Sequence, residues 1–275
     1  MHFGLTLPIG GPCADPRVLA DLAVRAEASG WDGLFLEDYV VFQGDAEAAT
    51  GDPWISLAAI AAATTRLRLG TKVTPLARRR PWIVARQAVA IDQLSGGRMI
   101  LGVGTGDVSD HVVRDASFTA FGEATEARER AERLDEALAI ITGLWSGEPF
   151  RHEGRHFTVG EVRFQPRPIQ EPRIPIWVGG GYPNPGPTAR AARWDGSVLY
   201  RADGQAMTAD DVRAIRDGAG DRPFDISVSA PRTGEGAVDA AALLELEAAG
   251  ATWASTYVPV AELATMRATI EAGPG

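Results

Sequence analysis

The stretch Arg66–Trp82, RLRLGTKVTPLARRRPW, decides the fold because it joins a strand, a loop and a helix in one short run. Its first half alternates leucine with polar residues and then turns β-branched, as strands do. A helix follows from Pro81, since a missing backbone N–H is tolerated at the first helical position. A parallel α/β barrel presents its active site where strands end in polar loops before helices. This stretch therefore predicts one βα unit of such a barrel.

The same strand-then-helix pattern repeats along the whole chain. We expect strands at His2–Pro8, Gly33–Leu36, Leu67–Thr74, Met99–Val103, Ile176–Gly179, Gly196–Tyr200, Ile226–Ser229 and Thr252–Val258. Helical patterns follow at Asp15–Ser29, Pro53–Thr64, Pro81–Leu94, Ala124–Leu144, Pro187–Arg193, Thr208–Ala219, Val238–Ala249 and Ala261–Glu271. Eight such repeats predict an α/β fold of the (β/α)8 TIM-barrel type, with residues 1–275 as a single domain. An open, doubly wound sheet is the alternative.

One segment interrupts this rhythm. Residues 146–175 are rich in glycine and proline, with alternating apolar residues around Phe157. Such a pattern predicts a hairpin and loops inserted before the fifth strand of the barrel.

Composition excludes several classes of function. The net charge of −9 argues against nucleic acid as a partner. No uninterrupted apolar run of about 18 residues exists, so no membrane span is expected. A single cysteine fits a cytoplasmic location. With four scattered histidines and no convincing third ligand, we expect no metal site.

The expected second strand ends in two acids and a phenol, Glu37, Asp38 and Tyr39. These are candidate catalytic residues, because carboxyl groups can act as general acid or base. Adjacent residues of a strand point to opposite faces, so Glu37 and Asp38 cannot both face one ligand. That geometry disfavours a glycoside hydrolase, which needs a pair of carboxylates flanking one bond.

Two glycine-rich turns follow later strands. Gly104-Thr105-Gly106 lacks the spacing of a dinucleotide fingerprint, so it either lets a planar ligand approach or simply turns the chain. Gly179-Gly180-Gly181, with the helix from Thr188, offers free N–H groups that suit a phosphate. The arginines from Arg78 to Arg80 suit an anionic tail, or form a solvated helix start.

Several motifs together resemble the bacterial luciferase-like oxidoreductase superfamily. They are Gly30-Trp31-Asp32-Gly33-Leu34-Phe35, Asp52-Pro53-Trp54, Arg66 to Thr71, Asp92-Gln93-Leu94-Ser95-Gly96-Gly97-Arg98, Leu101-Gly102-Val103-Gly104, Leu144-Trp145-Ser146-Gly147, Pro172 to Gly180 and Ala192-Arg193-Trp194-Asp195-Gly196. They occur in the family's order over about the first two hundred residues. The last quarter of the chain matches only generically.

The resemblance implies a TIM barrel that binds coenzyme F420 or flavin mononucleotide (FMN). Of the two we prefer F420, because the arginines from Arg78 to Arg80 suit its longer anionic tail. The resemblance also places a non-proline cis peptide at Lys72–Val73, supporting the ring of the cofactor. Together with the turns and arginines described above, this gives the candidate cofactor-binding residues Lys72, Val73, Thr74, Arg78, Gly104, Thr105, Gly106, Gly179, Gly180, Gly181 and Thr188.

The implied activity is oxidation or reduction of a small organic substrate, by hydride transfer or by oxygenation through a flavin peroxide. One position departs from the family, because Tyr39 stands where a histidine usually follows the acid. A tyrosine, with an ordinary pKa of about 10, shuttles protons poorly near neutral pH. Asp38 or Glu37 then takes over the proton, or Tyr39 stabilises an oxygen, or the chain is a catalytically silent relative. The family also suggests a homodimer.

Overall fold

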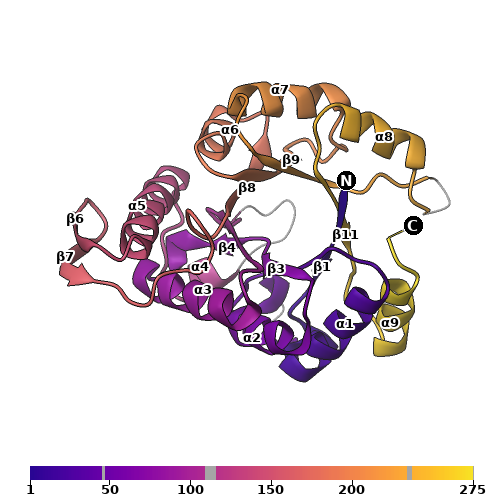
Figure 1. Ribbon diagram of the computed structural model, residues 1–275, viewed down its shortest axis with the longest axis horizontal. Helices are drawn as coiled ribbons and strands as arrows, with labels where there is room; N and C mark the ends of the chain where they lie inside the picture. The colour runs from indigo at the N-terminus through magenta and orange to yellow at the C-terminus, as the bar shows by residue number, and fades with distance from the viewer. Residues whose placement is uncertain (45–46, 109–115, 234–236, 275) are drawn as a thin grey trace.

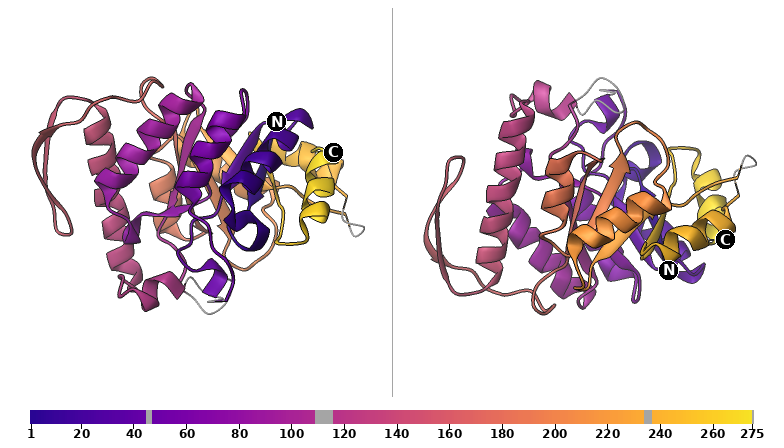
Figure 2. Two further views of the ribbon diagram at one scale, coloured as in Figure 1. Left: turned by 90° about the horizontal axis from the view of Figure 1, so that it is seen from below. Right: turned by 90° about the horizontal axis from the view of Figure 1, so that it is seen from above.

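The computed structural model describes residues 1–44, 47–108, 116–233 and 237–274 (Figure 1). Strands form a central ring in Figure 1, and helices lie outside the strands in Figures 1 and 2. The loop 107–117, which the sequence suggests as a partial lid, lies mostly outside the described residues.

The strands form a closed parallel barrel. In order around the ring they are β1 (His2–Leu7), β2 (Gly33–Leu36), β3 (Arg68–Thr71) with β4 (Thr74–Pro75), β5 (Met99–Gly104), β8 (Ile176–Tyr182), β9 (Gly196–Arg201), β10 (Asp225–Ser229) and β11 (Trp253–Tyr257). Pairing of β1 with β11 and of β3 with β5 closes the ring. The predicted (β/α)8 barrel is confirmed, and the alternative of an open sheet is wrong.

A helix follows each of the eight barrel positions in the described part of the chain. They are α1 (Pro16–Ala28), α2 (Pro53–Ala63), α3 (Pro81–Ser95), α5 (Ala127–Trp145), α6 (Pro185–Ala191), α7 (Ala209–Ala219), α8 (Ala240–Ala248) and α9 (Leu263–Glu271). Asp15 and Asp52 cap α1 and α2, each accepting from backbone N–H groups just past a first-turn proline. A short helix, α4 (Ala116–Ala120), precedes α5, and the sequence did not indicate it.

An aromatic plug fills the middle of the barrel. Phe35, Trp177 and Trp253 point inward from three strands, with ring centroids 5.3 to 5.9 Å apart. Ile100 and Val198 complete this buried cluster. Because the plug packs the middle of the barrel, a ligand cannot occupy that level, and a barrel of this type binds its ligand above it, at the carboxyl ends of the strands.

The third barrel position is interrupted. β3 ends at Thr71 and β4 begins at Thr74, and the peptide bond between Lys72 and Val73 is cis. The cis bond implied by the family resemblance is thus present at the expected residues.

The insertion contains an antiparallel hairpin of β6 (Pro149–Glu153) and β7 (Thr158–Arg163). It lies outside the barrel along α5 in both views of Figure 2. The hairpin predicted within residues 146–175 is therefore confirmed. That residues 1–275 form a single domain stays a prediction. Among the described residues, no helix is both long enough and apolar enough to cross a membrane.

Candidate active site

A cavity of about 200 Å³ opens at the carboxyl ends of the strands, above the aromatic plug. Its wall contains ten of the residues predicted from sequence: Glu37, Asp38, Tyr39, Lys72, Val73, Gly104, Thr105, Gly106, Gly179 and Gly180. Four others, Thr74, Arg78, Gly181 and Thr188, do not line it. The sequence reasoning missed three wall residues, Pro75, Asp107 and Tyr200.

Glu37 places a carboxyl group in the cavity wall with few hydrogen-bond partners. Burial raises the pKa of its carboxyl to about 7, opposed by a hydrogen bond from Tyr257. Its Oε2 atom is buried and has no hydrogen-bond partner among the described residues. A carboxyl group that titrates near neutral pH beside a cavity suits general acid–base chemistry.

Asp38 lies two residues beyond the end of β2, and its carboxylate is held in a hydrogen-bonded network although the residue also borders the cavity. Its side chain is fully buried, and its Oδ2 accepts a hydrogen bond of 2.8 Å from Thr74 Oγ1. Its Oδ1 lies 3.2 Å from Arg78 Nη2 and 2.5 Å from Arg79 Nη2. Because both oxygens are occupied in this network, the geometry does not favour Asp38 as a proton carrier.

Arg78 and Thr74 therefore lie behind the cavity wall, not on it. Arg78 also donates to the backbone carbonyl of Asp38, and only 3% of its side chain is exposed. The position of Arg78 gives no support to its predicted contact with an anionic tail. That role stays a prediction, and the structure instead shows Arg78 holding the end of β2 to the loop after β4.

Val73 forms part of the cavity floor, between two glycine-containing strands. A Cβ atom on Gly104 would lie 2.8 Å from Val73 Cγ2, and one on Gly179 would lie 3.0 Å from Val73 Cγ1. Larger residues at either position would collide with Val73. Glycine at these two positions therefore leaves room for the Val73 side chain against β5 and β8.

Lys72 points into the barrel from the same cis peptide. Its Nζ donates to Ser255 Oγ at 2.7 Å and to Ser227 Oγ at 3.1 Å. Burial lowers the pKa of this amine to about 7. The two serines lie on β11 and β10, and neither was predicted as a site residue.

At the candidate phosphate turn, the Thr188 N–H donates to the backbone carbonyl of Asn184. α6 starts at Pro185, two residues earlier than predicted, and the Thr188 hydroxyl bonds back to the carbonyl of Asn184 at 2.9 Å. Gly179 and Gly180 line the cavity, but Thr188 does not. Phosphate binding at this turn stays a prediction.

Arg130 of α5 positions part of the cavity wall, and the sequence did not indicate this role. Its Nη1 donates to the backbone carbonyls of Thr105 and Gly106, fixing the turn after β5. Its guanidinium also lies 5.6 Å from the ring centroid of Phe118. A long-range contact to backbone atoms leaves no motif in a sequence.

Tyr39 lines the cavity and packs edge-on against Phe42, with centroids 5.8 Å apart. In the described part of the chain, the cavity included, no group of three or more His, Cys, Asp or Glu side chains could hold a metal ion.

The family model for luciferase-like monooxygenases matches residues 1–270. The chain is 36% identical over 171 residues to an F420-dependent glucose-6-phosphate dehydrogenase of Microbacterium testaceum, covering 61% of this chain and 48% of that protein. It is 35% identical over 210 residues to the enzyme of the same name from Kineococcus radiotolerans, covering 74% of this chain and 58% of that protein. The match thus spans only about half the length of these relatives.

The fold is similar to a coenzyme F420-dependent tetrahydromethanopterin reductase from Methanopyrus kandleri. The TM-score is 0.74 at 18% identity, covering 99% of this chain and 98% of that structure. At this identity the likeness establishes the fold alone.

Proposed function

This chain belongs to the luciferase-like monooxygenase family, and on that premise we propose that it is an oxidoreductase using coenzyme F420, with FMN as the alternative. It transfers hydride to or from a small organic substrate. The observation that carries the proposal is the cavity floored by the cis Lys72–Val73 peptide at the mouth of the barrel. The names of the relatives favour F420 over FMN.

The residues present suit a planar ring with a polar edge. Gly104, Gly106, Gly179 and Gly180 present backbone without side chains to the cavity. Glu37 adds a buried carboxyl oxygen with no partner among the described residues. Ligand cavities typically combine such open, mostly apolar walls with a few polar groups. F420, when bound, would supply a ring carbon that accepts or releases hydride.

The chain's own residues would then place the substrate and move one proton. Oxidation of an alcohol removes a hydroxyl proton as the hydride leaves, so a base is needed beside the cavity. Glu37 fits this task because its pKa of about 7 lets it accept a proton near neutral pH. Tyr257 orients the carboxyl by a hydrogen bond. Asp38 is a positioning residue, fixing the loop that carries Arg78 and Arg79.

A direct assay tests this proposal. The purified chain is mixed with oxidised F420 and a panel of secondary alcohols and sugar phosphates, and the visible absorbance of the oxidised cofactor is followed. We expect absorbance to fall with at least one member of the panel. Tight binding without turnover on any donor or acceptor would favour the catalytically silent alternative. Failure to bind F420 and FMN would overturn the proposal. As part of the same proposal, the protein forms a homodimer and is located in the cytoplasm.

A further inference from the structure

Lys72 carries the only cationic side chain on the cavity wall, as far as residues 1–44, 47–108, 116–233 and 237–274 show. The acidic residues that line the cavity are Glu37, Asp38 and Asp107, and the carboxylate of Asp38 is held by Arg78 and Arg79. The positive charge of the cavity therefore comes from Lys72. Neither the cis peptide nor the packing of Val73 requires an ammonium group at this position.

Two hydroxyl groups hold the end of the lysine side chain. Ser255 and Ser227 each accept from Nζ, at 2.7 and 3.1 Å, and their Oγ atoms lie 3.0 Å apart. Both serines are almost fully buried and neither lines the cavity, so the lysine side chain extends from the cavity wall toward the barrel interior, where the serines fix its ammonium group. Neutral hydroxyls orient the charge without cancelling it, as a carboxylate partner would.

The surroundings of Lys72 make the protonation of its amine sensitive to the charge of a ligand bound in the cavity. Below the serines lies the aromatic plug of Phe35, Trp177 and Trp253, which offers no charged partner. Burial accordingly lowers the pKa of Lys72 to about 7. Negative charge placed in the cavity favours the protonated amine, and by reciprocity the protonated amine favours negative charge in the cavity.

We propose that Lys72, held by Ser227 and Ser255, tunes the redox equilibrium of the ring cofactor by stabilising the negative charge that hydride adds. The inference rests on the proposed function. A hydride carries two electrons and one proton, so the net charge of the ring falls by one when it is taken up. An ammonium group beside the ring lowers the free energy of that form relative to the oxidised form.

A purely structural lysine would behave differently. A lysine that only ties β3 to β10 and β11 would affect folding and the binding of both cofactor forms alike. A redox-tuning lysine changes the ratio of the two dissociation constants, because only one form carries the extra charge.

The test measures the dissociation constants of oxidised and dithionite-reduced cofactor for the wild-type chain, Lys72→Met and Lys72→Arg. Cofactor fluorescence reports the binding of one form and competition reports the other, without turnover. For Lys72→Met we expect the preference for reduced cofactor to fall at least tenfold, about 30 mV for a two-electron couple. Lys72→Arg, which keeps the charge, should retain most of the preference. An unchanged ratio in Lys72→Met would overturn the inference.

A second variant covers the case in which Lys72→Met does not fold. Ser255→Ala keeps the lysine but removes its 2.7 Å hydrogen bond, so the preference should fall by a smaller factor. An unchanged ratio in Ser255→Ala, with Lys72→Met unfolded, also contradicts the inference. If the wild-type chain binds neither F420 nor FMN, the proposed function fails, and that result is distinct from binding with an unchanged ratio.

Discussion

Glu37 and Asp38 are neighbours in the chain with opposite surroundings. Glu37 faces the cavity with an oxygen that has no partner among the described residues, whereas Asp38 is enclosed by Thr74, Arg78 and Arg79. The alternation of a β-strand alone predicts their opposite directions. It does not predict which acid meets the cavity, because the partners of Asp38 come from the next βα unit.

Glu37→Gln tests the proton-transfer role. Because Glu37 has a pKa of about 7, the wild-type rate of substrate oxidation should rise with pH through about 7 as the base form appears. The variant should lose that rise and about 10²–10⁴-fold in kcat. Steady-state rates against pH measure both effects, with Glu161→Gln on the exposed hairpin as control. A variant that keeps the pH-dependent rise would exclude Glu37 as the base.

The same substitution has a consequence for stability, with a defined sign. The folded pKa of Glu37 is raised from 4.5 to about 7, so its contribution to folding is fully present below pH 4.5 and is lost as pH rises through 7. Glu37→Gln cannot ionise. The free energy of unfolding of the variant minus that of the wild type should therefore increase from pH 5 to pH 8. Urea unfolding at the two pH values measures this change.

Asp38→Asn should destabilise the fold strongly. It removes the carboxylate from the buried Arg78 and the partly exposed Arg79, and breaking one partner of a buried pair costs about 3–5 kcal/mol. Urea unfolding at neutral pH measures this loss. Asp210→Asn, which removes an exposed pair with Arg213, should cost less than about 1 kcal/mol. Equal losses in the two variants would show that the Asp38 network does not stabilise the fold.

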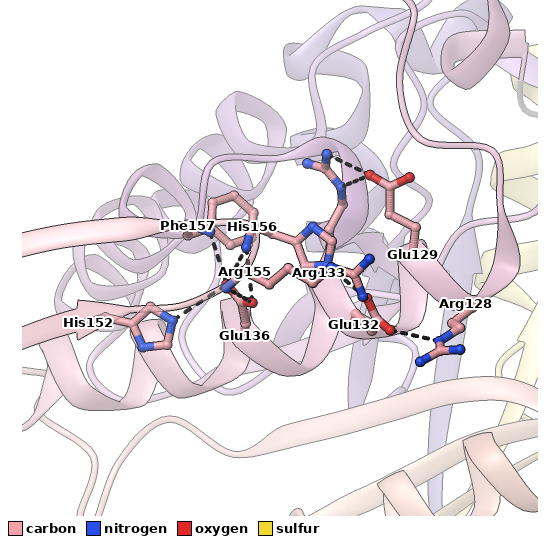
Figure 3. Close-up of polar contacts among 9 residues, drawn as sticks. All are labelled: Arg128, Glu129, Glu132, Arg133, Glu136, His152, Arg155, His156 and Phe157. Carbon is pink, nitrogen blue, oxygen red and sulfur yellow. Dashed lines mark hydrogen bonds and ion pairs between the residues drawn. The ribbon is translucent and has the colours of Figure 1, made fainter.

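At the scale of elements, the hairpin β6–β7 is held to α5 mainly by two carboxylates (Figure 3). Glu136 accepts from the backbone N–H groups of Arg155, His156 and Phe157 at 2.7 to 3.1 Å. Burial raises the pKa of Glu136, but these donors outweigh it and hold the pKa below its ordinary value. Glu132 adds a contact of 3.1 Å to His156 Nε2.

Glu136→Gln should release the hairpin without unfolding the barrel. Hydrogen bonds to a charged acceptor contribute about 1.5–3 kcal/mol each, and the neutral amide weakens them. Hydrogen exchange should accelerate at least tenfold in residues 149–163 and stay unchanged in β1, β2 and β11. Glu129→Gln, which removes a pair with Arg133 within α5, serves as the control. Unchanged exchange in the hairpin would mean that other contacts hold it.

Element positions were largely predictable from sequence, but their ends were not. The rhythm of short apolar strands and amphipathic helices predicted the eight barrel positions, and Pro53 after the cap Asp52 predicted the start of α2. α6 began earlier than expected, because Pro185 can occupy a first helical turn as well as Pro187. α4 is too short to show a helical period.

At the scale of the whole molecule, the unpredicted features are contacts between distant residues. Lys72 meets Ser227 and Ser255 across the barrel, at sequence separations of 155 and 183 residues. Arg130 of α5 reaches back 25 residues to Thr105 in the turn after β5, within one βα unit. Closure of the barrel brings Lys72 to the two serines, the placement of α5 brings Arg130 to its turn, and no local pattern encodes either contact. The cavity floor was foreseen because the family resemblance, not the periodicity, placed the cis bond at Lys72–Val73.

The most direct test of the central claim is a fluorescence titration of F420 and FMN with the wild-type chain and with Thr105→Phe. Thr105 lines the cavity of about 200 Å³, so a phenylalanine there should fill the space that a ring needs. We predict saturable binding of F420, tighter than that of FMN, in the wild type, and at least a tenfold weaker affinity in a folded Thr105→Phe variant. Absence of binding of either cofactor to the wild type, or equal binding by the variant, would contradict the account.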